Sequence, residues 1–261
     1  MAIQFYKYHG AGNDFVILDN RKKEYDFLTE QQVKKICNRH FGIGADGLML
    51  LNEKSGYDFE MIYFNADGQP GSFCGNGSRC IVQFAFNSGI KKEEYFFAAS
   101  DGNHEAKMKA DGTISVKMKD VDTIHQHHGD YILNTGSPHY IKIITDLQHL
   151  DVIKKGRDIR YHDDFKKEGI NVNFVENQTE PDKIKVRTYE RGVEDETLSC
   201  GTGVTAAALV CFHNDNGFNE VEVTTIGGML NVEFDRSSDG KYSNIWLYGP
   251  AEKVFEGVIP I

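Results

Sequence analysis

The hydrophobic pattern is most distinctive between Ser199 and Phe212, where a cysteine and two glycines lead into a run that is apolar on every side. A helix without a polar face has to be buried inside its domain. Its first turn still carries backbone N–H groups without intrahelical partners and a partial positive charge, and Cys200 stands there. The pattern therefore predicts a buried helix whose first turn is an anion site next to a thiol.

The same pattern occurs earlier in the chain. Cys74-Gly-Asn-Gly77 opens a second apolar run, 126 positions before Cys200-Gly-Thr-Gly203. Further short matches follow in unbroken order, each offset by 124 to 128 residues. They pair Gly12 with Gly136, Gly42-Ile43 with Gly169-Ile170, Phe64-Asn65 with Tyr189-Glu190, Asp101-Gly102 with Gly227-Gly228, and Asp111-Gly112 with Asp239-Gly240. We interpret the chain as two homologous domains.

Other elements follow from shorter patterns. Alternating apolar residues predict strands, for example from Ile3 to Tyr8 and from Phe59 to Phe64. Thr29 with Gln32 has the spacing of a capping box. A helix is expected behind it from the spacing of Val33, Ile36, Cys37 and Phe41. A helix-like segment from Leu150 to Ile159 takes the same place in the second half, and Asp-Gly or Gly-Gly turns predict hairpins after each buried helix.

The expected fold class is α/β, of the α+β kind. Each of two pseudo-symmetric domains is predicted to be a barrel-like, mostly antiparallel sheet wrapped around a central buried helix. The domains are placed at residues 1–122 and 123–261, with the C-terminal strands free to cross back to the first domain. The His-rich segment Ile124–His128 fits a linker between them. Both helix amino termini, with both cysteines, are then expected at one cleft.

Composition excludes several classes of function. The chain of 261 residues has a net charge of −10 and no basic run, so nucleic acid is not an expected partner. The first residues lack the apolar core of a signal peptide, and no apolar run approaches the length of a membrane span. Five cysteines without a Cys-x-x-Cys pair favour a reduced, cytoplasmic protein and no zinc site.

The two cysteines are the strongest candidates for chemistry. A thiol at a helix amino terminus has a lowered pKa, and glycine permits a ligand to approach the backbone closely. Two such sites facing each other would hold one carboxylate and present a base on each side of the adjacent carbon. That arrangement suits the movement of a proton from one face of a carbon to the other. The alternatives are that both are core residues or form a disulfide; Cys37, Cys80 and Cys211 are expected in the core.

Two weaker motifs are set aside. Gly42-x-Gly44-x-x-Gly47 has the letters of a dinucleotide fingerprint, but a helical pattern precedes it and a strand follows, which is the wrong context. The histidines of the segment His125–His128 have the chemistry of metal ligands, although a solvated linker is the preferred interpretation.

Several blocks of the sequence together resemble the diaminopimelate epimerases, the cofactor-independent two-cysteine racemases. The matching blocks are Gly10–Phe15, Gly42–Asp46, Phe64–Gly68, Cys74–Gly77, Gly136–His139, Asn171–Phe174, Glu190–Gly192, Cys200–Gly203 and Gly249–Ala251. The resemblance implies two pseudo-symmetric domains, no cofactor and no metal. It also implies interconversion of LL- and meso-diaminopimelate for lysine and peptidoglycan precursor synthesis, usually by a homodimer.

The resemblance also implies roles for single residues. Cys74 and Cys200 would be the acid/base thiols, tuned by His139 and Glu190. Backbone N–H groups of Gly75-Asn76 and Gly201-Thr202 would bind the reacting α-carboxylate. The remaining substrate contacts would come from Asn13, Gly47, Asn65, Ser137, Asn171, Glu190 and Arg191, of which Arg191 suits the distal carboxylate and Glu190 an ammonium group.

This sequence departs from the family pattern at three places. Ser137 stands where many members have asparagine, Gly47 stands where some have glutamine, and the spacer Val193–Asp195 is one residue longer than usual. These differences concern substrate contacts rather than the proton-transfer pair. The alternatives left open are an epimerase of another amino acid such as hydroxyproline, a non-catalytic binding protein, and a thiol oxidoreductase.

Overall fold

The computed structural model describes residues 2–71, 74–212 and 216–260, which form two compact units. Unit 1 consists of Met1–Val116 together with Gly249–Ile261, and unit 2 is Lys117–Tyr248. The division between the units thus lies a few residues before the limit drawn from the sequence, and the C-terminal segment groups with the first unit. Among the described residues, no helix is both long enough and apolar enough to cross a membrane.

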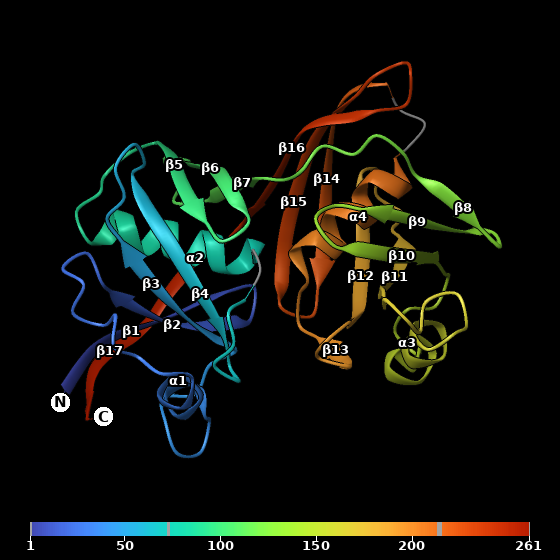
Figure 1. Ribbon diagram of the computed structural model, residues 1–261. Helices are drawn as coiled ribbons and strands as arrows, with labels where there is room; N and C mark the ends of the chain where they lie inside the picture. The colour runs from blue at the N-terminus through green and yellow to red at the C-terminus, as the bar shows by residue number, and fades with distance from the viewer. Residues whose placement is uncertain (1, 72–73, 213–215, 261) are drawn as a thin grey trace. The chain divides into compact units, whose positions relative to one another are not determined.

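Unit 1 is a curled sheet with two helices (Figure 1). Its strands pair in the order β17–β1–β2–β3–β4–β5–β6–β7. In chain order the elements are β1 (Ala2–Gly10), β2 (Asn13–Asp19), α1 (Glu30–Cys37), β3 (Gly47–Asn52), β4 (Phe59–Asn65), α2 (Gly75–Asn87), β5 (Glu94–Ala99), β6 (Gly102–Met108), β7 (Ile114–Lys117) and β17 (Glu252–Pro260).

Unit 2 has the corresponding elements. Its strands pair in the order β8–β9–β10–β11–β12–β14–β15–β16, with β13 added to β12. The elements are β8 (His125–His127), β9 (Asp130–Asn134), β10 (Pro138–Ile143), α3 (Val152–Arg160), β11 (Asn171–Asn177), β12 (Lys183–Glu190), β13 (Asp195–Thr197), α4 (Gly201–Cys211), β14 (Gly217–Thr225), β15 (Gly228–Arg236) and β16 (Tyr242–Gly249).

The succession of strand directions is the same in both units. From β1 to β7 the pairs run antiparallel, parallel, antiparallel, parallel, antiparallel and antiparallel. From β9 to β16, leaving β13 aside, the pairs repeat this succession without a change. The internal repeat inferred from the sequence is therefore a repeat of topology, and the mixed α/β, sheet-dominated class is confirmed.

The sheet of unit 1 is covered on both faces, because successive apolar residues along its strands point to opposite faces. Phe15 and Met49 point into the cluster around α2, whereas Val16 and Leu48, the next residues along β2 and β3, point into the cluster around α1. This alternation follows from the two-residue period of a strand. Helix α2 is thereby enclosed, as its apolar sequence requires, and α4 is buried along nearly its whole length in unit 2.

Helix α1 begins at the predicted capping box. The Thr29 side chain accepts from the Gln32 backbone N–H, and the Gln32 side chain accepts from the Thr29 N–H. The placement of Phe41 on this helix was wrong: α1 ends at Cys37, and Phe41 is 82% exposed. The chain turns back there so closely that Gly42 lies against the Lys35 carbonyl, which leaves no room for a further helical turn.

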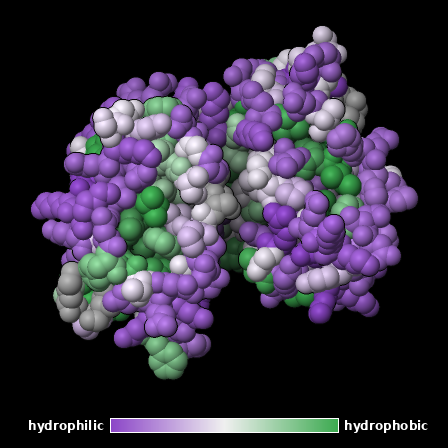
Figure 2. All heavy atoms as spheres, in the orientation of Figure 1, coloured by the Kyte–Doolittle hydropathy of each residue, from purple (hydrophilic) through white to green (hydrophobic). Residues whose placement is uncertain are grey.

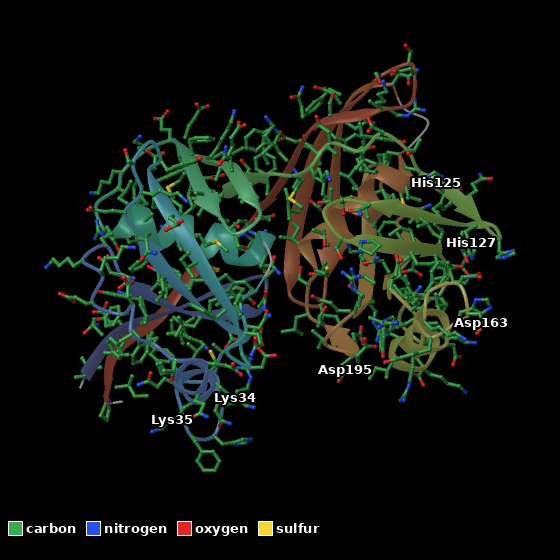
Figure 3. All side chains as sticks on the ribbon, viewed as in Figure 1. Lys34, Lys35, His125, His127, Asp163 and Asp195 are labelled. Carbon is green, nitrogen blue, oxygen red and sulfur yellow. The ribbon has the colours of Figure 1, made fainter. Side chains whose placement is uncertain are left out.

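The interpretation of the His-rich segment as a linker was also wrong in part. His125–His127 form strand β8, which pairs with β9 through His125–Ile132 and His127–Asp130. His128 and Gly129 make the tight turn with positive φ between them. Figure 3 labels His125 and His127 on this hairpin, and Lys34 and Lys35 on the polar side of α1. The exposed face seen in Figure 2 is mainly hydrophilic, with scattered apolar residues.

Candidate active site

Both buried helices begin directly after a cysteine. Cys74 is the N-cap of α2 and Cys200 the N-cap of α4, each with an extended backbone at φ −125° and −113°. An N-cap side chain lies beside the unpaired N–H groups of the first turn, where a negative charge is favoured. Cys74 is half-buried and Cys200 is 8% exposed. None of the described cysteines is in a disulfide.

The other three thiols lie in different surroundings. Cys37 and Cys80 are buried and Cys211 is half-buried, each within or at the end of a helix. Burial raises the pKa of Cys37 and of Cys211 to about 12 and the pKa of Cys80 still further. These three remain thiols at neutral pH and serve packing, as expected from the sequence.

Cys74 meets the side chain of Asn13. Its Sγ lies 3.5 Å from Asn13 Oδ1, and the Gly77 N–H points to Sγ at the same distance. The amide of Asn76 also donates to Asn13 Oδ1 at 3.5 Å. Asn13 at the start of β2, the N-cap of α2 and the first turn of α2 therefore come together in unit 1. The amide oxygen of Asn13 accepts from both neighbours.

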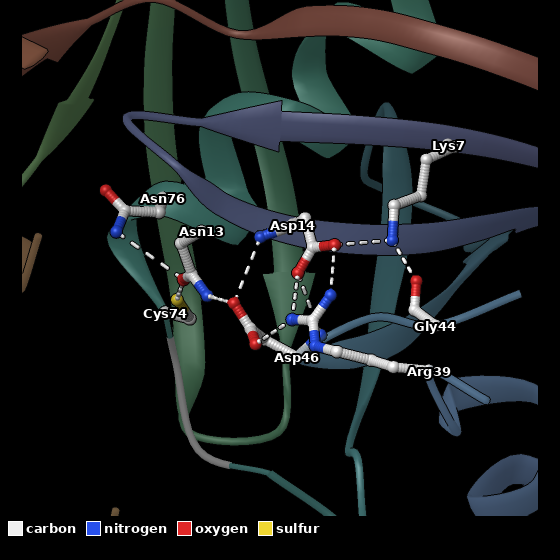
Figure 4. Close-up of polar contacts among 8 residues, drawn as sticks. All are labelled: Lys7, Asn13, Asp14, Arg39, Gly44, Asp46, Cys74 and Asn76. Atoms are coloured by element: carbon white, nitrogen blue, oxygen red, sulfur yellow. Dashed lines mark hydrogen bonds and ion pairs between the residues drawn. The ribbon is translucent and has the colours of Figure 1, made fainter. Parts of the chain in front are cut away.

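A charged network fixes the other end of Asn13 (Figure 4). Asn13 Nδ2 donates to Asp46 Oδ2 at 2.6 Å, and Arg39 bridges Asp46 and Asp14 with nitrogen–oxygen distances of 2.7 and 2.8 Å. Lys7 lies 2.6 Å from the second oxygen of Asp14. Burial opposes ionisation of Asp14, yet the hydrogen bonds from Arg39 and Lys7 hold its pKa well below the usual range. Asp46 thereby determines which way the amide of Asn13 faces.

A buried arginine supports the first turn of α2. Arg79 is fully buried, and its guanidinium donates to Asn76 Oδ1 at 2.7 Å and to the carbonyls of Gly75 and Pro250 at 3.4 and 3.5 Å. Burial lowers its pKa to about 10, so the group stays charged at neutral pH. This positive charge, missed from the sequence, stands beneath the residues expected to bind a carboxylate. The only signal for it was a charged residue within an otherwise apolar run.

Cys200 has a different partner in unit 2. Its Sγ lies 3.5 Å from Thr202 Oγ1, and that hydroxyl lies 2.9 Å from Nε2 of His139. His139 on β10 is completely buried, and its Nδ1 receives the Asn173 amide at 3.1 Å. Burial, aided by the field of Arg191, lowers the pKa of His139 to about 3. The imidazole is therefore neutral. It is linked to Cys200 by hydrogen bonds through the Thr202 hydroxyl and not by an ion pair.

Ser137, Asn171 and Arg191 form a second polar group of unit 2. Asn171 donates to Ser137 Oγ at 2.8 Å and accepts from the Arg191 backbone N–H at 2.9 Å. The Arg191 guanidinium donates to Ser137 Oγ at 3.3 Å and to the carbonyl of Glu168 at 3.1 Å. The hydroxyl of Ser137 thus accepts hydrogen bonds from both the Asn171 amide and the Arg191 guanidinium. Glu190, one residue earlier, accepts from Thr197 at 2.8 Å.

Gly47 and Asn65 lie at paired ends of β3 and β4. A side chain at position 47 would collide with the ring of Tyr63, whose Cε2 is 2.4 Å from the Cβ position. Tyr63 therefore fills the space that a glutamine would need, which explains the glycine here. Asn65 is exposed at the end of β4, and its described contacts are backbone bonds of the turn to Gln69.

One group of side chains in unit 2 has the spacing of metal ligands, and it contains no cysteine. Within the described residues, His127, His128 and Asp164 are the one such group, with ligand atoms all within 4.8 Å of one another. His127 Nε2 and Asp164 Oδ2 are 3.3 Å apart, a distance that an ordinary ion pair explains. The group is largely exposed and shares no hydrogen bond with the residues around Cys200.

Comparison with known proteins gives a consistent result. A family model described as diaminopimelate epimerase matches residues 5–124 and 131–254. A diaminopimelate epimerase of Flavobacterium psychrophilum is 44% identical over 98% of this chain and 100% of its own length. One of Chlorobaculum tepidum is 41% identical over 97% and 99%.

Solved structures share the fold at low sequence identity. A phenazine biosynthesis protein of the PhzF family from Bacillus anthracis aligns with a TM-score of 0.76, 16% identity and complete coverage of both chains. A hydroxyproline epimerase from Agrobacterium vitis aligns with a TM-score of 0.66 and 14% identity, over 99% of this chain and 92% of its own. These likenesses show the fold.

The two helix glycines should respond differently to alanine. A Cβ at Gly203 would stand 2.2 Å from Asn173 Oδ1, whereas at Gly77 its nearest neighbours are Met49 Sδ and Phe15 Cζ at 3.3 and 3.4 Å. Gly203→Ala must displace the buried Asn173, so we expect a loss of about 2 kcal/mol in the free energy of unfolding. Gly77→Ala, the matched control, should change it by less than about 1 kcal/mol, because a flexible thioether can yield. Equal losses in urea denaturation would contradict this.

His139 should make stability depend on acidity. In the unfolded chain its pKa is near 6.5, and in the folded protein about 3. As the pH falls, His139 therefore binds its proton in the unfolded chain before it does so in the folded protein. The free energy of unfolding that is present above pH 6.5 is lost progressively between pH 6.5 and pH 3, with a slope of up to about 1.4 kcal/mol per pH unit. His139→Gln should lose this contribution, measured by urea denaturation between about pH 7 and pH 5. The exposed His149→Gln, as control, should keep the slope; an unchanged slope in His139→Gln would refute the assignment.

Proposed function

Because the chain belongs to the diaminopimelate epimerase family, we propose that it interconverts LL- and meso-2,6-diaminopimelate with Cys74 and Cys200 as its two proton-transferring groups. The reaction is an isomerisation, and it supplies lysine biosynthesis and peptidoglycan precursors. The observation that carries the residue assignment is the shared position of these thiols. Of the described cysteines, they alone are N-caps of buried helices.

The proton transfer uses one thiolate and one thiol. The thiolate removes the α-proton, the C–H electron pair stays on carbon, and the thiol then delivers its proton to the opposite face of the same carbon. One thiol and one thiolate remain, with their roles exchanged, so the reverse reaction begins from the product state. Groups with well-matched pKa values at this position typically contribute 10²–10⁴-fold to the rate.

The charge that develops on the α-carboxylate needs donors already in place. Backbone N–H groups of Gly75-Asn76 and of Gly201-Thr202 belong to the first turns of α2 and α4, where such groups lack intrahelical acceptors. Donors fixed before the reaction cost no rearrangement while the charge develops. The buried cation of Arg79, bonded to Asn76 and Gly75, strengthens the field at the first of these turns.

The distal end of the substrate is assigned to the remaining polar residues. The guanidinium of Arg191 is a planar fork of donors suited to a carboxylate. It donates to Ser137, and the Arg191 backbone N–H donates to Asn171. Glu190 is assigned to an ammonium group, and Asn13 and Asn65 to further polar groups of the substrate. A second carboxylate distinguishes diaminopimelate from proline-type substrates, so this cluster favours diaminopimelate over hydroxyproline.

The assignment is tested by isotope exchange in deuterated water. The reduced protein should convert LL-diaminopimelate to the meso isomer carrying deuterium at the inverted α-carbon, without an added cofactor. Cys74→Ala and Cys200→Ala should each lower epimerisation by at least about 10²-fold. Cys211→Ala, the matched control, should keep the rate, because its thiol lies at the far end of α4.

Two outcomes would contradict the proposal. Unchanged epimerisation in either cysteine variant would remove that thiol from the mechanism. Inversion of trans-4-hydroxy-L-proline without any inversion of diaminopimelate would move the chain's substrate to the proline type. A fall in the free-thiol count during turnover would instead indicate a redox reaction.

For the assembly we propose a homodimer that uses strand β17. Its side chains Val254, Phe255 and Val258 are exposed apolar groups on an exposed strand, with Val258 62% exposed. Val258→Asp should therefore shift the protein toward the monomer in sedimentation equilibrium, whereas Val193→Asp, at a residue of similar exposure on unit 2, should leave the mass unchanged. A monomeric wild type, or an unchanged mass in Val258→Asp, would contradict this surface.

The compartment we propose is the cytoplasm. The proposed mechanism requires Cys74 and Cys200 to stay reduced, and the cytoplasm keeps cysteines reduced. Cell fractionation tests this, and recovery of the protein outside the cytoplasmic fraction would contradict it.

A further inference from the structure

The surroundings of Cys200 contain a chain of hydrogen bonds with a fixed direction. Asn173 lies on β11, His139 on the neighbouring strand β10, and Thr202 in the first turn of α4. Asn173 and His139 are both fully buried. The chain runs from the Asn173 amide to His139 Nδ1, then from His139 Nε2 to Thr202 Oγ1, and it ends at Cys200 Sγ. Asn173 belongs to none of the roles assigned above.

Two further contacts fix the orientation of the Asn173 amide. Its Nδ2 donates to the Tyr140 carbonyl at 3.2 Å, and its Oδ1 accepts from Thr188 Oγ1 at 2.9 Å. A carbonyl oxygen only accepts, so the NH₂ group must be the one that faces Tyr140 and, with it, His139 Nδ1. Nδ1 therefore acts as an acceptor. Since His139 is neutral, its single proton is on Nε2.

This tautomer decides what the Thr202 hydroxyl can do. Nε2–H donates to Thr202 Oγ1, so the imidazole cannot also take the hydroxyl hydrogen. That hydrogen is then available for Cys200 Sγ, 3.5 Å away, in a contact where either atom can be the donor. In the opposite tautomer Nε2 would accept the hydroxyl hydrogen, and Cys200 would lose this donor. A donor polarised by a preceding hydrogen bond is also a stronger one.

We propose that Asn173 is a positioning residue which, by setting the tautomer of His139, keeps the Thr202 hydroxyl as a hydrogen-bond donor to Cys200 and so favours the thiolate of Cys200. The proposal rests on the proposed function, in which Cys200 works as a thiolate in one direction of the reaction. It gives the tuning role expected of His139 a specific form, that of a neutral hydrogen-bond donor. A pKa of about 3 for that imidazole agrees with this role.

Gly203 makes the chain of hydrogen bonds possible. Asn173 Oδ1 and His139 Cε1 occupy the space next to its Cα, at 2.2 and 3.4 Å from a Cβ position. The second glycine of the Cys-Gly-Thr-Gly motif thus makes room for this pair of side chains. Two charged residues of the same unit are Arg191, whose field acts on His139, and Glu190, which accepts from Thr197. The substitutions at Asn173 and Thr202 leave both residues in the chain.

The Cys74 thiol serves as a control inside the same molecule. Its described partners are Asn13 Oδ1 and the Gly77 N–H, and none belongs to the chain that ends at Cys200. Alkylation of the substrate-free protein by iodoacetamide as a function of pH, resolved for each cysteine by mass spectrometry, gives the two thiol pKa values separately. Thr202→Val removes the hydroxyl while keeping the shape and the backbone N–H, and Thr202→Ser keeps the hydroxyl.

We expect Thr202→Val to raise the pKa of Cys200 by roughly one to two pH units and to leave that of Cys74 unchanged. Thr202→Ser should match the wild type. Asn173→Ala should raise the pKa of Cys200 in the same direction. In ¹⁵N spectra of histidine-labelled protein, His139, assigned from a His139→Gln sample, should carry its proton on Nε2 in the wild type and populate both tautomers in Asn173→Ala.

Either of two results would overturn the proposal: an Nδ1-protonated His139 in the wild type, or an unchanged Cys200 pKa in Thr202→Val. Because no substrate is present, these results are separate from epimerase activity. An active enzyme with an unchanged Cys200 pKa in Thr202→Val would refute this inference alone. A protein with the expected pKa change that does not invert diaminopimelate would refute the proposed function alone.

Discussion

A helix that is apolar on all sides must be enclosed by the rest of its domain, and this constraint organises both halves of the molecule. Strands have to surround α2 and α4, so each sheet curls. The first turn of such a helix cannot be buried without partners for its N–H groups. It therefore remains directed toward a polar site, and the cysteine that precedes it becomes part of that site.

The two halves share a topology but differ in the side chains that support the thiols. Arg79 is five residues after Cys74, and the corresponding residue after Cys200 is Thr205, whose hydroxyl donates to the Gly201 carbonyl. On one side an amide oxygen held by a charged network faces the sulfur. On the other side a hydroxyl coupled to a neutral imidazole does so. A duplicated scaffold thus gives two chemically unlike environments, which suits the proposed roles of the two thiols, one as thiolate and the other as thiol.

The repeat, the capping box of α1 and the two helices that start at cysteines could be predicted because they depend on local sequence. Phe41 was misplaced because the end of α1 is set by the packing of Gly42 against it, a contact that periodicity does not contain. His125–His127 were taken for a linker because a short strand rich in polar residues has no apolar alternation. The sequence does not reveal Arg39, Arg79 and Asn173, because each has a partner distant along the chain: Asp14, Pro250 and His139 respectively.

The pairing of β17 with β1 has a consequence for how the molecule forms during translation. Unit 2 is a continuous stretch of chain, so its last strand is synthesised before the segment Gly249–Ile261 that groups with unit 1. Unit 1 needs Gly249–Ile261 to cover β1, and Pro250 to accept a hydrogen bond from Arg79. The half whose synthesis begins first is therefore completed last, and β1 lacks its β17 partner until the C-terminal segment has been made.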